Sequence, residues 1–242
     1  MKPVFAVYSS FLQRGYDQLI HDIAIQNLPV TICVDRAGIV GADGETHQGL
    51  FDLAFLSHIP NFVIMAPKNF EELEKMLEFS VNSDRPTVIR YPRGGEGKIK
   101  FKTCDKIDIG KAEIIKEGKD LTIVALGKMV EKAVEISEQL EKKGTSVEVI
   151  NARFLKPIDK ETILKSIDKT KKIITIEDGL LKGGLGSTVL ESVNRSEIKN
   201  VKIKSFGYEE HFVEHGKVEE LEQKYGLNIE SIFKSIEQEI LQ

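Results

Sequence analysis

The sequence is poor in cysteine and contains no tryptophan, with two cysteines among its 242 residues. Two cysteines are too few for a disulfide scaffold. Cys33 stands in a predicted strand and Cys104 in a polar connector, so we expect a reduced, cytoplasmic protein. No apolar run approaches the roughly 20 residues that span a bilayer. The first residues also lack the sustained apolar core and the cleavage site of a signal peptide.

Neither sign of charge dominates the chain. There are 34 basic and 38 acidic residues mixed along it, with a net charge of −4, and no basic stripe that would indicate a nucleic-acid partner. An anionic ligand must therefore be held by a few local arginines. The hydrophobic content of 41% and the charged content of 30% are typical of a soluble globular protein without a membrane partner.

Short apolar runs alternate with helix-period patterns, which predicts an α/β fold of two units with mainly parallel sheets. We expect the units at residues 1–94 and 119–242, with a charged, irregular connector at 95–118. Asn69, followed by Glu72 three residues later, is typical of a helix start. Strands are predicted over 4–8, 30–34, 62–65, 87–90, 121–126, 146–150, 172–176 and 201–206. Helices are predicted within 12–23 and 70–77 and over 130–142, 160–167, 184–193 and 218–240.

The most informative segment is the loop from Arg36 to Gly49, called here the 36–49 loop. It follows an apolar run and places Arg36, Asp43, Thr46 and His47 among four glycines, which let a backbone turn sharply and approach a ligand closely. A cation, a carboxylate and an imidazole together suit a phosphorylated, hydroxylated substrate. From the residues alone, a long surface loop with solvated charges stays an open alternative.

Three other features have both a functional and a structural interpretation. Phe11 follows a strand end, where its ring either accepts a flat heterocycle or packs in the core. The glycine-rich segment after Glu177 does not have the spacing of a phosphate loop, and glycines there also permit close packing of a helix on a strand. His211 and His215 have the i, i+4 spacing of zinc ligands, but no third ligand is evident, and we expect no metal ligands in the chain.

Four segments carry a family resemblance: Tyr-Ser-Ser-Phe-Leu-Gln-Arg at 8–14, Val-Asp-Arg-Ala-Gly at 34–38, Gly-Ala-Asp-Gly-Glu-Thr-His-Gln-Gly at 41–49 and Arg-Tyr-Pro-Arg-Gly at 90–94. Asp-Gly-x-Thr-His is shared across transketolase-like enzymes that use thiamine diphosphate. The first two segments resemble the 1-deoxy-D-xylulose-5-phosphate synthase family in particular. The resemblance covers essentially the whole chain but only the C-terminal part of such an enzyme.

The resemblance implies roles for seven residues, most of them in binding. Phe11 corresponds to the aromatic residue that stacks on the aminopyrimidine ring of the cofactor. Arg36 and Arg93 resemble the pair that holds the phosphate of the acceptor, which suits the bidentate guanidinium group. Tyr8 and Arg14 extend the same polar cluster, although a helix-surface position for Arg14 is an equal alternative.

The remaining two residues are the catalytic candidates. By resemblance, Asp43 hydrogen-bonds a hydroxyl group of the acceptor, and His47 handles protons on the donor and acceptor oxygens. In the family, the glutamate that activates the cofactor and the Gly-Asp-Gly motif for diphosphate and magnesium lie upstream of the segment that matches Met1. We therefore expect a truncated pyrimidine-binding domain followed by a C-terminal domain, with thiamine diphosphate and Mg²⁺ anchored largely outside this chain.

The implied activity is that of a transferase that condenses pyruvate with glyceraldehyde 3-phosphate, releases carbon dioxide and feeds isoprenoid and thiamine biosynthesis. We expect this chain to be inactive by itself and to work as a homodimer or with an N-terminal subunit. A truncated product, an internal start and a split gene all fit. Two alternatives stay open, namely a subunit of another transketolase-like enzyme with a sugar-phosphate donor, and a non-catalytic assembly or regulatory module.

Overall fold

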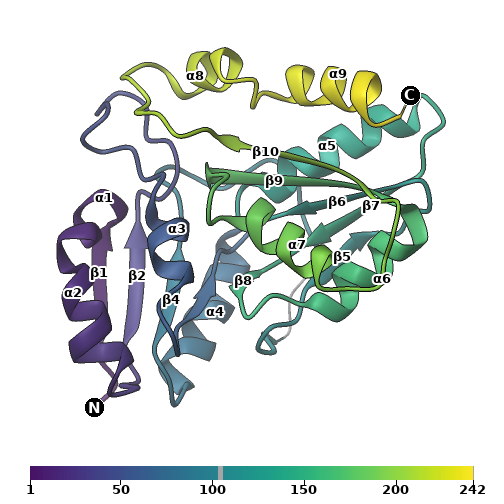
Figure 1. Cartoon of the computed structure of the whole chain (residues 1–242). Helices are drawn as coiled ribbons and strands as arrows, with labels where there is room; N and C mark the ends of the chain where they lie inside the picture. Colours follow the sequence, from purple (N-terminus) through teal and green to yellow (C-terminus); the bar gives the residue numbers. More distant parts are fainter. Residues whose placement is uncertain (103–105, 242) are drawn as a thin grey trace.

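The computed structural model describes residues 1–102 and 106–241, which form two units that each contain a five-stranded sheet flanked by helices (Figure 1). Strands pair in parallel except for β3 with β8 and β5 with β7. The predicted α/β class with mainly parallel sheets is confirmed. No helix in the described part of the chain is long and apolar enough to cross a membrane.

The first sheet combines strands from both units. In pairing order it contains β1 (Val4–Tyr8), β2 (Thr31–Asp35), β4 (Thr87–Arg90), β3 (Val63–Met65) and β8 (Phe154–Lys156). The central strands β2 and β4 are buried, as expected for short apolar runs in a parallel sheet. Cys33 lies buried in β2, where burial raises the pKa of its thiol. Cys104 lies outside the described residues.

Apart from α4, the helices of the first unit are short. The predicted helical pattern at 12–23 becomes a series of turns interrupted at Gly15, a residue that disfavours a continuous helix. The side chain of Asn69 accepts the N–H of Glu72 at 2.9 Å, so the predicted helix start is confirmed. The elements are α1 (Ser9–Leu12), η1 (Gln13–Gly15), α2 (Tyr16–Gln18), η2 (Leu19–Ala24), α3 (Asp52–Ser57) and α4 (Phe70–Asn82).

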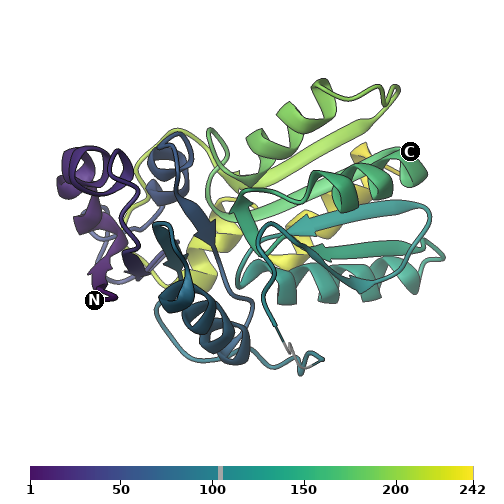
Figure 2. The same cartoon turned by 90° about the horizontal axis from the view of Figure 1, so that it is seen from below.

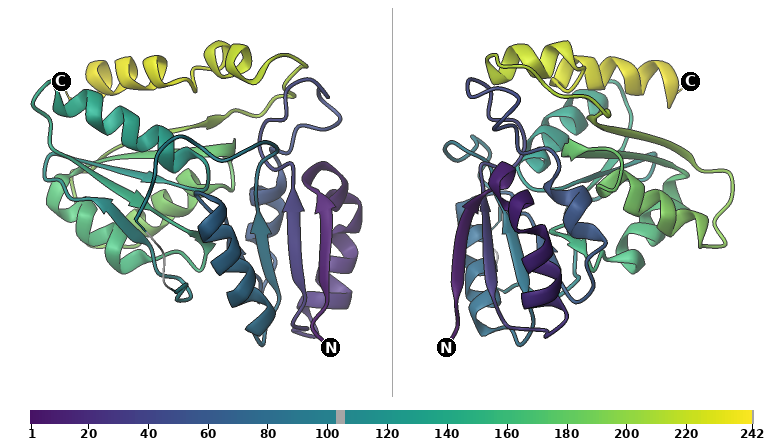
Figure 3. Two further views of the ribbon diagram at one scale, coloured as in Figure 1. Left: turned by 180° about the vertical axis from the view of Figure 1, so that it is seen from behind. Right: turned by 60° about the vertical axis from the view of Figure 1, so that its left-hand side comes forward.

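The second sheet has helices on both faces. Seen from behind, α5 lies beside α9 (Figure 3), and these two helices are in contact. Helices α8 and α9 lie behind the second sheet when the molecule is seen from below (Figure 2). The strands in pairing order are β10 (Lys202–Tyr208), β9 (Lys172–Leu180), β6 (Leu121–Ala125), β7 (Val147–Asn151) and β5 (Glu113–Lys116). The helices are α5 (Met129–Glu141), α6 (Lys160–Thr170), α7 (Leu185–Asn194), α8 (Val218–Lys224) and α9 (Ile229–Glu239).

The sequence patterns miss two strands and merge two helices. Strand β5 lies in the expected connector, and β8 has three residues, too few to show a period. The helix expected over 218–240 is interrupted, because Gly226 adopts a positive φ of 71° and Asn228 caps a new helix by accepting the N–H of Ser231.

A buried ionic network joins α4 of the first unit to the second sheet. The Glu72 carboxylate lies 3.0 Å from Nζ of Lys68 and 2.7 Å from Nε of Arg153, and Nδ2 of Asn151 donates to it at 3.0 Å. Lys68 also contacts Glu113 at 2.7 Å. Burial would raise the pKa of Glu72, but the adjacent Lys68 and Arg153 outweigh it, so this pKa lies below its ordinary value.

We predict that Glu72→Gln lowers the free energy of unfolding by roughly 3 kcal/mol at pH 7, the low end of the range for a broken buried ion pair, because Lys68 and Arg153 lose one of their two carboxylate partners and retain Glu113. The depressed pKa of Glu72 stabilises the fold above the ordinary value of 4.5, and this contribution is lost as the pH falls below it. When the pH falls from about 5 to about 3, the free energy of unfolding should therefore decrease less in the variant than in the wild type. Urea unfolding followed by circular dichroism measures both effects.

The control is Glu230→Gln, which removes an exposed carboxylate paired with Lys234 on α9. We expect it to leave the unfolding free energy nearly unchanged. An equal loss of stability in both variants would contradict a special role for the buried network.

Candidate functional site

Two glycines close the base of the 36–49 loop. The N–H of Gly38 donates to the carbonyl of Gly49 at 2.6 Å, and the reverse bond measures 2.7 Å. A Cβ at Gly38 would lie 1.7 Å from Oδ2 of Asp178, and a Cβ at Gly49 would lie 2.3 Å from the carbonyl oxygen of Arg36. Both positions therefore require glycine. This Gly38–Gly49 pair, called here the neck, holds the two ends of the loop close together, as in a compact surface loop.

Gln48 fixes the loop above the neck. Its Oε1 accepts the N–H groups of Val40 at 2.8 Å and Gly41 at 3.3 Å, and its Nε2 donates to the carbonyl of Glu214 at 3.0 Å. Figure 1 shows the loop rising from the first sheet toward the segment that precedes α8. The second unit thus supports the loop on one side.

An aromatic and cationic cluster stands beside the loop, at the end of β1. The rings of Tyr8 and Phe11 stack with centroids 5.5 Å apart, and His47 meets Phe11 edge-on at 5.4 Å. The guanidinium carbon of Arg36 lies 4.1 Å from the centroid of Tyr8, and that of Arg14 lies 5.8 Å from the centroid of Phe11. Phe11 is 40% exposed, which leaves part of its ring open to a ligand.

Two guanidinium groups converge on one carboxylate. Oδ2 of Asp43 lies 2.8 Å from Nη1 of Arg36 and 3.2 Å from Nη1 of Arg93. Arg93 follows β4, whereas Asp43 is carried by the loop. The two arginines thus share one carboxylate, a group whose oxygens accept from guanidinium groups in much the same way as those of a phosphate.

A cavity of about 390 Å³ adjoins the two arginines. Its wall combines apolar side chains with groups of both charges and lies between the two units. The lining residues include Arg36, Arg93, Lys128, Phe70, Leu73 and Glu131.

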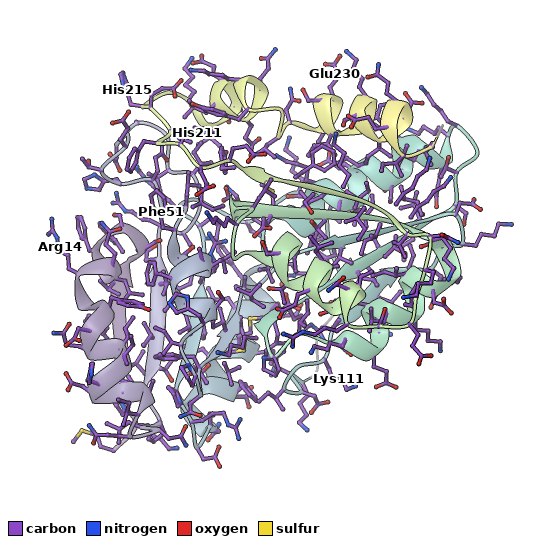
Figure 4. The ribbon with its side chains drawn as sticks, viewed as in Figure 1. Arg14, Phe51, Lys111, His211, His215 and Glu230 are labelled. Atoms are coloured by element: carbon purple, nitrogen blue, oxygen red, sulfur yellow. The ribbon has the colours of Figure 1, made fainter. Side chains whose placement is uncertain are left out.

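The seven candidates from the sequence lie in one region, where six of them are linked by a chain of pairwise contacts and Arg14 lies at the margin beside Phe11. Figure 4 labels Arg14 on the flank of the first unit. His211, also labelled there, stacks on Tyr225 with centroids 4.7 Å apart. No group of three or more His, Cys, Asp or Glu side chains among residues 1–102 and 106–241 is arranged to hold a metal ion.

The glycine-rich segment after Glu177 has a structural explanation. The Glu177 carboxylate accepts the N–H groups of Leu185 at 2.7 Å and Gly186 at 2.8 Å, so it caps the start of α7. Burial raises the pKa of Glu177 to about 7, although these two donors oppose the shift.

Sequence patterns miss a buried set of groups below the loop. Nε of Arg90 donates to Asp52 at 2.9 Å, and its Nη2 donates to the carbonyl of Asp178 at 2.8 Å. An arginine at the end of a buried strand indicates, already in the sequence, that a buried acidic or carbonyl group pairs with it, because arginine is rarely buried without a partner. The partner Asp178 lies 88 positions further along the chain, where no local pattern marks it.

Sequence models of two transketolase domains match the chain, the pyrimidine binding domain at residues 1–95 and the C-terminal domain at residues 110–232. The 1-deoxy-D-xylulose-5-phosphate synthase of Halothermothrix orenii is 51% identical over 236 residues, which are 97% of this chain and 37% of that protein. The synthase of Clostridium tetani is 48% identical over 98% of this chain and 38% of its own length. The chain thus spans less than two-fifths of these relatives.

A solved structure described as a split gene transketolase, inactive beta4 tetramer, superposes with a TM-score of 0.88. It is 29% identical in sequence, and the match covers 99% of this chain and 76% of that one. The two domain matches, the closely related synthases and the shared fold agree with one another. The chain therefore belongs to the transketolase family, with matches to its pyrimidine-binding and C-terminal domains.

Proposed function

We propose that the chain forms the acceptor-binding side of a 1-deoxy-D-xylulose-5-phosphate synthase, which condenses pyruvate with glyceraldehyde 3-phosphate and releases carbon dioxide. The observation that carries the proposal is the convergence of Arg36 and Arg93 on one anionic group beside His47. The names of the related synthases support it.

In this proposal, the acceptor phosphate takes the place of the Asp43 carboxylate between Arg36 and Arg93. Asp43 is then free to accept a hydrogen bond from an acceptor hydroxyl. Oγ1 of Thr46 lies 2.9 Å from Nδ1 of His47 and orients the ring. This contact leaves Nε2 of His47 to exchange protons with substrate oxygens.

The residues present also fit one part of thiamine diphosphate. The partly exposed ring of Phe11, backed by Tyr8, offers an apolar surface to a flat aminopyrimidine. When bound, the cofactor supplies the carbanion chemistry that the side chains of the protein lack. We propose that its diphosphate and Mg²⁺ are held mainly by the part of the relatives outside the match, in a homodimer or in a complex with an N-terminal subunit.

A second candidate is a subunit of another transketolase-like enzyme that uses a sugar-phosphate donor. The similarity to the split gene transketolase favours it. The two candidates share the pair of Arg36 and Arg93, called here the phosphate clamp, and differ in the donor.

We predict that the chain releases carbon dioxide from pyruvate and glyceraldehyde 3-phosphate only when combined with a polypeptide that supplies the rest of a related synthase. The assay contains thiamine diphosphate and Mg²⁺ and is run with and without that polypeptide. Activity of the chain alone would refute the need for it. Turnover with sugar-phosphate donors but not with pyruvate would favour the second candidate.

We further predict that substitutions of Arg93 and Asp43 change the affinity for inorganic phosphate in opposite directions. Arg93→Ala should weaken binding about tenfold or more through the loss of a charge-assisted contact. Asp43→Asn should strengthen binding, because it removes the carboxylate that competes for both arginines. NMR titration of the amide signals of the loop measures the two affinities. The control is Arg85→Ala, since Arg85 precedes β4 at the opposite end of the strand. Equal affinities in all variants would rule out the clamp.

A further inference from the structure

Asp178 brings a buried carboxylate from the second unit to the neck of the loop. It lies in β9 and is 2% exposed. Its Oδ1 accepts the N–H of Ile39 at 3.2 Å, and its Oδ2 fills the space that a side chain at position 38 would need. The Gly38 side of the neck therefore packs directly on this carboxylate.

The Gly49 side of the neck is linked to the backbone carbonyl of Asp178 through Arg90. The carbonyl of Asp178 accepts from Nη2 of Arg90, and this nitrogen also lies 3.4 Å from the carbonyl of Gly49. Two residues beyond Asp178, the N–H of Leu180 donates to the carbonyl of Leu50 at 3.1 Å. Both ends of the loop are thus held by one short segment of β9.

Lys128 sets the orientation of the carboxylate. Its Nζ lies 2.6 Å from Oδ2 of Asp178, which leaves Oδ1 directed at Ile39. A buried carboxylate without such a partner would be strongly destabilising. The side chain of Lys128 is 29% exposed and also lines the cavity beside Arg36 and Arg93.

We propose that Asp178 is a positioning residue for the acceptor site: its carboxylate fixes the neck so that Asp43 and His47 stand beside Arg93 and Phe11. This role rests on the proposed function of the loop. The second unit then contributes to substrate binding without touching the substrate, through a contact between segments 139 residues apart. Asp178 does not take part in proton transfer, and its effect is confined to the geometry of the loop.

The test compares Asp178→Ala with Asp178→Asn in the full chain. Alanine removes the acceptor for Ile39, whereas the asparagine carbonyl oxygen retains it, because Nζ of Lys128, on a side chain that is 29% exposed, turns to solvent away from the asparagine NH2 group. We expect Asp178→Ala to accelerate amide hydrogen exchange at Ile39 and Gly49 at least tenfold relative to amides in α9. The ring protons of His47 should lose the shift caused by Phe11, and the affinity for inorganic phosphate should fall several-fold. Asp178→Asn should restore all three readouts to near the wild-type values.

The matched control is Asp168→Ala, which removes an exposed aspartate of the second unit that pairs with Lys171. It should leave the three readouts unchanged. Uniform acceleration of exchange throughout Asp178→Ala, or equal loss at the loop in both Asp178 variants, would overturn the positioning role. If the alanine variant does not fold, exchange at Ile39 in Asp178→Asn decides, because loss of its protection contradicts the proposal.

The two proposals fail in different ways. If the wild-type chain does not bind inorganic phosphate, the phosphate clamp is refuted. Exchange at Ile39 and Gly49 and the His47 ring signals still decide whether Asp178 holds the loop.

Discussion

The buried guanidinium of Arg90 is the interaction on which the site depends. It contacts the carboxylate of Asp52 directly and reaches the carbonyls of Gly49 and Asp178, so it joins α3, the loop and the second sheet. A buried cation is tolerated only when its donors are satisfied. The first and second units can therefore meet at this point in one arrangement, and that arrangement sets the direction in which the loop leaves the first sheet.

The loop above this point combines a rigid base with an accessible tip. The neck hydrogen bonds and the two bonds that Gln48 accepts are buried, whereas Asp43, Arg36 and Arg93 are partly exposed. A site built in this way holds its backbone in place while its charged side chains exchange partners. Under the proposed function, phosphate binding requires a change of partner at Asp43 rather than a movement of the whole loop.

Much of the fold follows from local patterns. The buried strands at Thr31–Asp35 and Thr87–Arg90 were visible as apolar runs, and the helix start at Asn69 as a capping pattern. Strand β8 was not visible, because its three residues become a strand only by pairing with β3. The buried network around Glu72 was hidden for the same reason, since its members come from α4, β5 and the region of β7 and β8.

The sequence by itself determined the α/β class and the residue types of the site, because periodicity and glycine spacing are local properties of the chain. It also contained the arginines, the aspartate and the histidine of the loop region in recognisable segments. Only the tertiary structure decided that Arg36 and Arg93 share Asp43 and that Asp178 supports the neck. The contacts of Arg93 with Asp43 and of Ile39 with Asp178 join residues 50 and 139 positions apart, and their geometry follows from tertiary packing rather than from any local preference.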